Sequence, residues 1–338
     1  MASGVWRSPA FDREGAFRRG NLHCHSTRSD GGIDPGEVVA AYRDRGYDFI
    51  CLSDHFEAEY GWQVTDTSPW RDTSFTTLIG AELSSPGPVA PGKWWLGAVG
   101  LPLHFAPVRN SETGPELAAR ARASGAFVVL LHPGFNATRA RDIEGLHAIN
   151  AVEVYNDGVQ RGHDRGDGWY LAVELLDAGG DLLCTAADDA HFAQGGLDAI
   201  GGAWVMVRSR SLDPDALLAA LKAGAFYASC GPEIHDVAVV GREVEVRCSP
   251  ATVVSMTGPG CLARHVAHHR WDGGDGPSAL FGTVIASEPD GITVCRLTLD
   301  SPGAAAPWGT WRPGDWWRVT ITDGDGRRAW TNPVRIPR

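Results

Sequence analysis

The sequence lacks several features that would place the protein in a membrane or secreted class. No run of about 18 apolar residues occurs, so we expect no membrane-spanning helix. Residues 1–20 are polar and arginine-bearing, without the apolar stretch of a secretory signal. The seven cysteines include no Cys-x-x-Cys pair, and Cys24, Cys51 and Cys184 lie in apolar runs. We therefore expect buried thiols in a reducing, cytoplasmic compartment.

The signature motifs of several enzyme classes are also missing. The chain has no Gly-x-Ser-x-Gly, no P-loop and no paired-glycine dinucleotide fingerprint. The net charge is -11, and nearly all of it lies before Pro232, where 19 Lys and Arg oppose 29 Asp and Glu. An acidic surface argues against general nucleic-acid binding.

The pattern of apolar residues changes near Pro232 and predicts two domains. Before it, short apolar runs alternate with helical segments, which is typical of parallel strands covered by helices. We expect strands at residues 49–53, 77–81, 96–101, 127–131, 151–155 and 182–186, with a seventh carrying His23, and helices at 35–46, 115–124, 168–178 and 214–223. Residues 56–74, 84–94 and 156–167 are expected to form long loops. After Pro232, alternating residues and Asp-Gly turns predict a small all-β, sandwich-like domain at 233–338.

Metal-capable side chains recur where the predicted strands end. His23 and His25 are two residues apart, so on a strand their side chains would share a face. Because the carboxyl ends of parallel strands meet at one rim, five such endings in order predict a multinuclear metal site. Mixed imidazole and carboxylate ligands suit zinc, iron or manganese. The other endings are Asp54-His55, Glu82, His132 and Asp188-Asp189-Ala190-His191.

This ordered set resembles the motifs of the PHP (polymerase and histidinol phosphatase) family over residues 20–232. The matching segments are His23-x-His25 with Asp30, Ser53-Asp54-His55, Glu82, His132-Pro133 and Asp189-x-His191. Residues 221–232 and the β-rich tail resemble the family's carbaryl-hydrolase-like branch. The resemblance implies an α/β fold, a distorted (β/α)7 barrel at 1–232, and phosphoester hydrolysis with two or three divalent ions.

The resemblance also implies which residues bind each ion. His23, His25, Glu82 and Asp189 would hold the first. Glu82 would bridge to a second ion that His132 also binds, with either His163 or Asn156 as a further ligand. Asp30, His55 and His191 would hold the third. Relatives often carry a histidine on the strand after the bridging glutamate, where this sequence reads Gly92-Lys93-Trp94-Trp95.

The expected chemistry follows from the charges. A water that bridges two cations ionises near neutral pH and attacks the ester, while the cations neutralise the developing oxyanion. Asp54 is expected to orient a ligand or a water, or only to cap its loop. Arg139 and Arg161 either clamp a phosphate or are solvated surface residues. Loop aromatic residues either stack on a substrate ring or pack the loops: Tyr60, Trp62, Trp70 and Trp94.

The sequence therefore predicts a metal-dependent phosphoesterase acting on a small anionic ester. One alternative is a carbamate, carboxylic ester or amide hydrolase with the same metal site. The other is a metal-stabilised binding module without activity.

Overall fold

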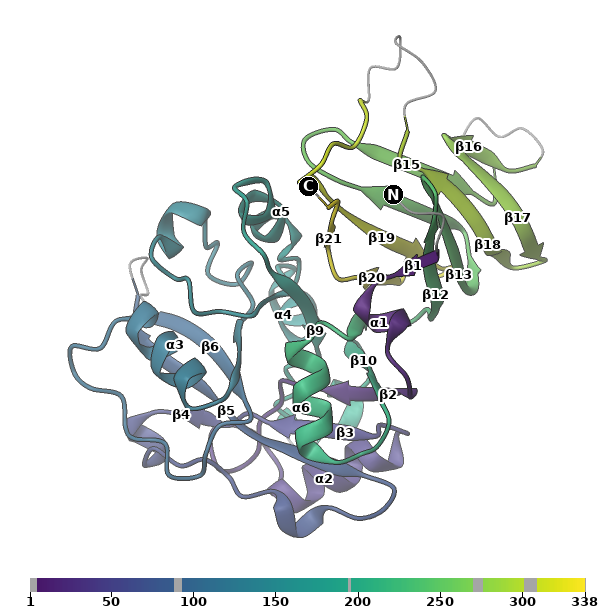
Figure 1. The fold of residues 1–338 in the computed structure, drawn as a ribbon. Coiled ribbons are helices and arrows are strands. Elements are labelled where there is room, and N and C mark those ends of the chain that lie inside the picture. The colour runs from purple at the N-terminus through teal and green to yellow at the C-terminus, as the bar shows by residue number, and fades with distance from the viewer. Residues whose placement is uncertain (1–4, 88–92, 194–195, 270–275, 301–308, 338) are drawn as a thin grey trace. The chain divides into compact units, whose positions relative to one another are not determined.

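The computed structural model describes residues 5–87, 93–193, 196–269, 276–300 and 309–337 (Figure 1). The chain forms two compact units, one of residues 14–223 and one of residues 1–13 with 224–338. Residues at the start of the chain belong to the second unit because β1 (Val5–Arg7) pairs with β12 (Ile234–Val240).

The unit of residues 14–223 is a mixed α/β structure. Its sheet has the order β10-β2-β3-β5-β6-β7-β8-β9. Pairing is parallel within β2-β3-β5 and within β7-β8-β9. The strands are β2 (Ala16–Asn21), β3 (Phe49–Leu52), β4 (His55–Phe56), β5 (Thr76–Pro86), β6 (Lys93–Val99), β7 (Phe127–Leu130), β8 (Ala151–Asn156), β9 (Leu183–Ala187) and β10 (Trp204–Ser209).

The expectation of parallel pairing is wrong at β6, which runs antiparallel to both β5 and β7. A parallel crossover needs about a dozen residues or more. Since β5 ends at Pro86 and β6 begins at Lys93, the connection is too short for one. The residues predicted as a loop at 84–94 are therefore partly strand, apart from 88–92, which lie outside the described residues.

Backbone contacts connect the segments that follow β2 and β9, which are the first and last strands of the order β2-β3-β5-β6-β7-β8-β9. Cys24 and Ala190 form an isolated parallel bridge. The backbone N–H of Asp189 donates to the carbonyl of His23 at 3.0 Å, and that of His25 donates to Ala190 at 2.9 Å. The histidine pair therefore follows β2, which ends at Asn21, and does not lie within the strand as predicted.

Helices pack against these strands. Helix α2 begins with a capping box of Asp34 and Glu37 and packs on β3. Helix α3 contacts β5, β6 and β7, α5 contacts β8, and α6 contacts β10 (Figure 1). The segment expected as a loop at 156–167 contains α4. The helices of this unit are α2 (Pro35–Asp44), α3 (Gly114–Ala123), α4 (Asp157–His163), α5 (Trp169–Asp177) and α6 (Pro214–Lys222), with 3-10 turns η1 (Ala58–Tyr60), η2 (Ser68–Trp70), η3 (Ala140–Ile143) and η5 (Leu197–Ala199).

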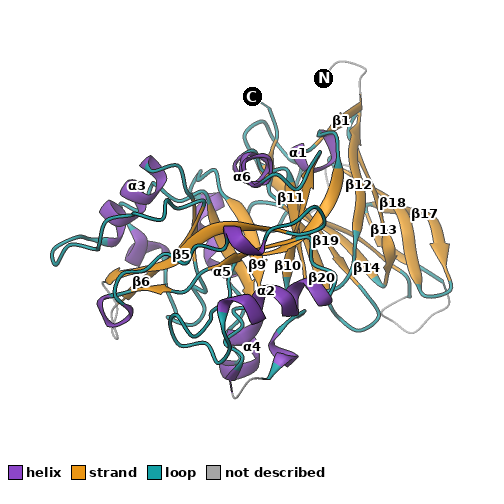
Figure 2. Ribbon diagram, turned by 90° about the horizontal axis from the view of Figure 1, so that it is seen from below, coloured by secondary structure: helices purple, strands orange, loops and turns teal. Residues whose placement is uncertain are grey.

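The second unit contains two antiparallel sheets (Figure 2). The predicted alternation of buried and more exposed residues is present at Val253–Thr257 and Trp316–Thr322. One has the order β1-β12-β13-β18-β17, and the other β16-β15-β14-β19-β20-β11, with β21 on β19. Its elements are α1 (Pro9–Asp12), β11 (Phe226–Ser229), β13 (Glu243–Ala251), β14 (Val253–Thr257), β15 (Ala263–Ala267), β16 (Ser278–Leu280), β17 (Gly282–Glu288), β18 (Gly291–Thr298), β19 (Trp316–Thr322), β20 (Arg328–Thr331) and β21 (Val334–Arg335). Among the helices that the structure describes in either unit, none is long and apolar enough to span a membrane.

Candidate metal centre

Four buried side chains, which we call the inner group, converge at one rim of the α/β unit: His23, His25, Glu82 and Asp189. His23 Nε2 lies 3.2 Å from Glu82 Oε2 and 3.2 Å from Asp189 Oδ1. His25 Nε2 lies at the same 3.2 Å from both of those oxygens. Two nitrogens and two oxygens thus face a common centre.

This spacing fits a divalent cation. Ligand atoms that bind one ion at about 2.0–2.2 Å lie roughly 3.0–3.5 Å from one another. Among the described residues, His25 Nε2 and Asp189 Oδ1 are buried atoms without a hydrogen-bond partner. Because buried polar atoms are normally satisfied, these two atoms fit ligands of an ion better than members of a hydrogen-bond network.

Charge sets the protonation of the inner group before a metal binds. Burial raises the pKa of Glu82, but His23 and His132 outweigh burial and hold that pKa well below its usual range. Burial lowers the pKa of His23, and the carboxylates of Asp189, Glu153 and Glu82 outweigh it, so this pKa lies well above the usual value. The carboxylates are therefore ready to bind, and a metal must displace a proton from an imidazole.

Glu82 also reaches a third histidine. Its Oε1 lies 3.2 Å from His132 Nε2, while its Oε2 faces the inner histidines. The ligand atoms of His23, Glu82 and His132 lie within 4.8 Å of one another. The two oxygens of one carboxylate thus face different imidazoles, which is the geometry of a bridging ligand.

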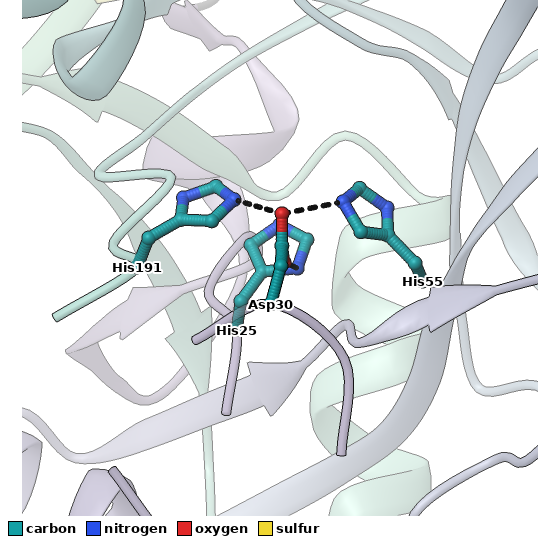
Figure 3. A group of neighbouring side chains, drawn as sticks. All are labelled: His25, Asp30, His55 and His191. Carbon is teal, nitrogen blue, oxygen red and sulfur yellow. Dashed lines mark hydrogen bonds and ion pairs between the residues drawn. The ribbon is translucent and has the colours of Figure 1, made fainter. Parts of the chain in front are cut away.

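A third set of side chains, the outer group of Asp30, His55 and His191, lies beside His25 (Figure 3). Asp30 Oδ2 lies between the two rings, 3.3 Å from His55 Nε2 and 3.4 Å from His191 Nε2. His55 also faces the inner group, because its Nδ1 lies 3.2 Å from Glu82 Oε2. Burial lowers the pKa of His55, but Asp30 and Glu82 outweigh burial and raise it to about 10.

The further ligand expected for the second ion is not brought into these groups. His163 lies at the end of α4, and its ring contacts Phe135 at 5.0 Å between centroids. The Oδ1 of Asn156 accepts a hydrogen bond of 2.8 Å from the N–H of Val159, so this oxygen caps α4.

Asp54 organises the loop that carries Asp30. Its buried carboxylate accepts hydrogen bonds from the backbone N–H of Ser26 at 2.7 Å and from the hydroxyls of Ser26, Ser29 and Thr65. These contacts favour the loop-capping expectation over a role at the ligands themselves.

The two candidate arginines lie in different places. A cavity of about 670 Å³ opens over the metal-capable side chains, and Arg161, His163 and Trp95 also line it. The Arg161 guanidinium is held there by Asp157, at 2.7 Å. Arg139 lines a separate cavity with Arg141 and Arg165, so the structure does not bring it to the ligand groups.

The aromatic residues that line the cavity are ones the sequence did not single out: Trp95, Phe135 and Phe192. Of the loop aromatics, Trp62 packs on Phe56, Trp70 lies against the core, Trp94 is buried and Tyr60 stacks on His55. Trp95, on β6, has its ring 5.2 Å from the His55 ring and 6.1 Å from that of His132. Trp95 pairs with Ser84 on the neighbouring strand β5. Ser84 is two residues after Glu82 and so lies on the same face of β5, which means that the Trp95 side chain also points to the face of the ligands.

Sequence reasoning also missed Glu153 as a site residue. Its Oε1 lies 3.0 Å from His23 Nδ1, and its Oε2 accepts a hydrogen bond of 2.9 Å from the backbone N–H of His132. The available signal was a single carboxylate within the apolar strand of residues 151–155, because an ionised group there needs a partner.

The comparisons with known proteins give distant structural likenesses. No family model matches the sequence, and no curated protein matches it. A solved two-domain protein from Bacteroides vulgatus, containing a predicted PHP-like metal-dependent phosphoesterase, is 16% identical with a TM-score of 0.48, covering 98% of this chain and 100% of that one. An amidohydrolase from Chromobacterium violaceum, solved with sulfate and without metal, is 14% identical with a TM-score of 0.38, covering 51% of this chain and 87% of that one.

Proposed function

We propose that residues 14–223 form a PHP-type, metal-dependent phosphoesterase. The observation that carries this proposal is the position of Glu82, whose two oxygens face His132 on one side and the inner histidines on the other. A bridging carboxylate between imidazole ligands suits a site for two ions that act together on one ester. The distorted (β/α)7 barrel belongs to the same proposal, and the bridge between Cys24 and Ala190 supports it.

The proposed ligands follow the three groups. The inner group would hold the first ion, Glu82 and His132 the second, and the outer group the third. Water, or His163 from the wall of the cavity, would complete the second site, because the amide of Asn156 is hydrogen-bonded to Val159, Glu153 and Asp189. Zinc, manganese and iron all fit this mixture of imidazole and carboxylate ligands. The buried thiols of Cys24, Cys51 and Cys184 support a reducing, cytoplasmic setting.

Each residue then has a separate task. When bound, the ions supply an activated water and neutralise negative charge that develops on the ester. Arg161, anchored by Asp157 at the cavity, would bind phosphoryl oxygens through its guanidinium. Trp95 and Phe135 line the same cavity and would restrict the access of bulk water.

A second candidate is the hydrolysis of a neutral ester, carbamate or amide by the same centre. The observation that favours it is the limited positive charge opposite the ligands, where Arg161 is the one arginine among the cavity's described lining residues. The two functions differ in their need for this arginine, since only an anionic substrate forms charge-assisted hydrogen bonds with it.

The test combines metal analysis with a substrate panel. Protein stripped with chelator and reloaded with zinc, manganese or iron should hydrolyse p-nitrophenyl phosphate or bis-p-nitrophenyl phosphate, and the stripped protein should not. Arg161→Ala should raise KM for phosphoesters by roughly 10-fold or more, with Arg139→Ala as the matched control. Turnover of neutral esters alone, unaffected by Arg161→Ala, would select the second candidate. A metal-loaded protein inactive on every substrate would favour the binding module.

A further inference from the structure

Two buried residues beneath the metal centre contact several of the proposed ligands at once. Glu153 Oε1 lies 3.0 Å from the Nδ1 of His23, the ring nitrogen turned away from the inner group. Its Oε2 accepts hydrogen bonds of 2.9 Å from the backbone N–H of His132 and from Asn156 Nδ2. Both Glu153 and Asn156 are buried.

A bulge in β8 explains why these two side chains meet. In a regular strand, residues three apart point to opposite faces. The pairing with β9 shifts by one residue, since Glu153 pairs with Thr185 and Tyr155 with Ala186. The extra residue brings Glu153 and Asn156 to the same face, toward the ligands.

Asn156 extends the contacts in two directions. Its Nδ2 donates a second hydrogen bond, of 3.1 Å, to Asp189 Oδ2, while Asp189 Oδ1 faces the inner histidines. Its Oδ1 caps α4, the helix that carries Arg161 at the cavity. One amide therefore connects a proposed metal ligand to the helix on the substrate side.

Two of the three ligand residues that this pair touches have an unusual backbone. His132 has φ of +24° and Asp189 has φ of +51°. Residues with side chains rarely adopt positive φ, and such conformations persist where the surroundings hold them in place. Glu153 accepts a hydrogen bond from the backbone N–H of His132, and Asn156 donates one to the carboxylate of Asp189. These bonds hold the two residues in place.

We propose that Glu153 and Asn156 together position the ligands of the metal centre. Glu153 orients the His23 ring and makes Nε2 a stronger ligand by accepting a hydrogen bond from the Nδ1–H. It also fixes the backbone at His132. Asn156 aims the Asp189 carboxylate and couples it to α4. Carboxylates that support a ligating histidine typically contribute 10–100-fold to metal affinity. This inference rests on the proposed metal site but not on the reaction or substrate.

The first test is metal affinity in Glu153→Gln, measured by competition between zinc and a chromophoric chelator. The variant keeps the side-chain volume and loses the charge, so the tightest zinc should bind roughly 10–100-fold more weakly. Absorption of the cobalt-substituted protein should also change. Glu112→Gln is the matched control, because Glu112 is a buried carboxylate paired with Arg109 and Arg120. This control should lower the Tm without changing zinc affinity.

Asn156→Ser provides a second variant that preserves the helix cap. Serine is a good N-cap residue but is too short to reach Asp189, so zinc affinity should fall while α4 remains helical. Zinc affinities within about twofold of wild type in both variants would overturn the proposal. A wild-type protein that binds no metal would overturn it together with the metal centre. Weakened zinc binding in a protein that hydrolyses no phosphoester would support the positioning pair and remove only the proposed reaction.

Discussion

The inner and outer groups contain the same types of ligand but differ in how the protein holds them. In the inner group, the side chains of Glu82 and Asp189 are 1% and 9% exposed. Glu153 and Asn156 support His23 and Asp189 through hydrogen bonds. In the outer group, the side chains of Asp30 and His191 are 41% and 36% exposed. Burial and fixed orientation strengthen charge interactions, so we expect a tightly bound inner ion and an exchangeable outer one.

The largest effect is expected from Glu82→Gln, because Glu82 contacts the histidines of the inner group and also His55 of the outer group. The substitution removes the negative charge between two cations that would lie roughly 3.5–4 Å apart, so double occupancy becomes unfavourable. We expect the loss of the first and second ions together and a decrease in kcat on the order of 10³-fold or more. Elemental analysis and anomalous scattering at each site measure this. Retention of all ions would contradict a bridging role.

A matched pair of carboxylate variants sharpens the contrast. Asp189→Asn should release the inner ion and decrease activity by roughly 10²-fold or more, whereas Asp30→Asn should leave the inner ion bound and cost roughly 10-fold. The reason is that Asp189 faces both inner histidines at 3.2 Å, while Asp30 lies closest to the outer rings of His55 and His191 and is 3.6 Å from His25 Nδ1. Equal metal loss in the two variants would show that the groups are not independent.

The pH dependence should separate the two groups further. In the metal-free protein the pKa of His55 is raised to about 10, so a metal that enters the outer group must displace its proton. Affinity there should rise about tenfold for each pH unit between about 7 and 10.

The same shift has a consequence for stability. A raised histidine pKa stabilises the folded, metal-free protein below the unfolded value near 6.5, and this contribution is lost as pH rises through about 10. Metal competition and thermal melts of stripped protein, in steps from pH 6 to 10, measure both effects. A flat affinity profile would argue against His55 as an outer ligand.

The smallest effect is expected from His163→Ala. His163 lies at the end of α4 and lines the cavity outside both groups, so at most one ion should be lost. The inner ion should remain fully bound, as measured by elemental analysis. Loss of the inner ion in this variant would overturn the assignment of four ligands to the inner group.

The convergence of the metal-capable side chains is predictable from the sequence, because the carboxyl ends of parallel strands meet at one rim. That rule brings His25, His132 and Asp189 into one neighbourhood, as the structure has them. The wrong expectation at β6 leaves the site intact, because none of the proposed ligands lies on β6. The strands that carry or precede the proposed ligands all run in one direction.

The residues that support the ligands were not predictable from periodicity. Glu153 and Asn156 are three apart, a spacing that places them on opposite faces unless a bulge intervenes. Trp95 could not be distinguished from Trp94 until the register with β5 was known, since a shift of one residue exchanges the two faces. The role of β1 depends on pairing with a strand far along the chain, which local pattern does not encode.

The closure of the α/β unit also fixes when the metal centre becomes available during synthesis. The N–H of Asp188 donates to Asn21 Oδ1, across 167 residues of sequence, at the point where β9 returns to the segment that follows β2. Contacts between such distant residues form late, because the loop between them must first be closed. A growing chain that carries His23, His25 and Glu82 therefore still lacks Asp189 and the bridge that holds the histidines. Full metal capacity would appear only when β9 has emerged and docked, so tight metal binding would report that the strands from β2 to β9 have assembled.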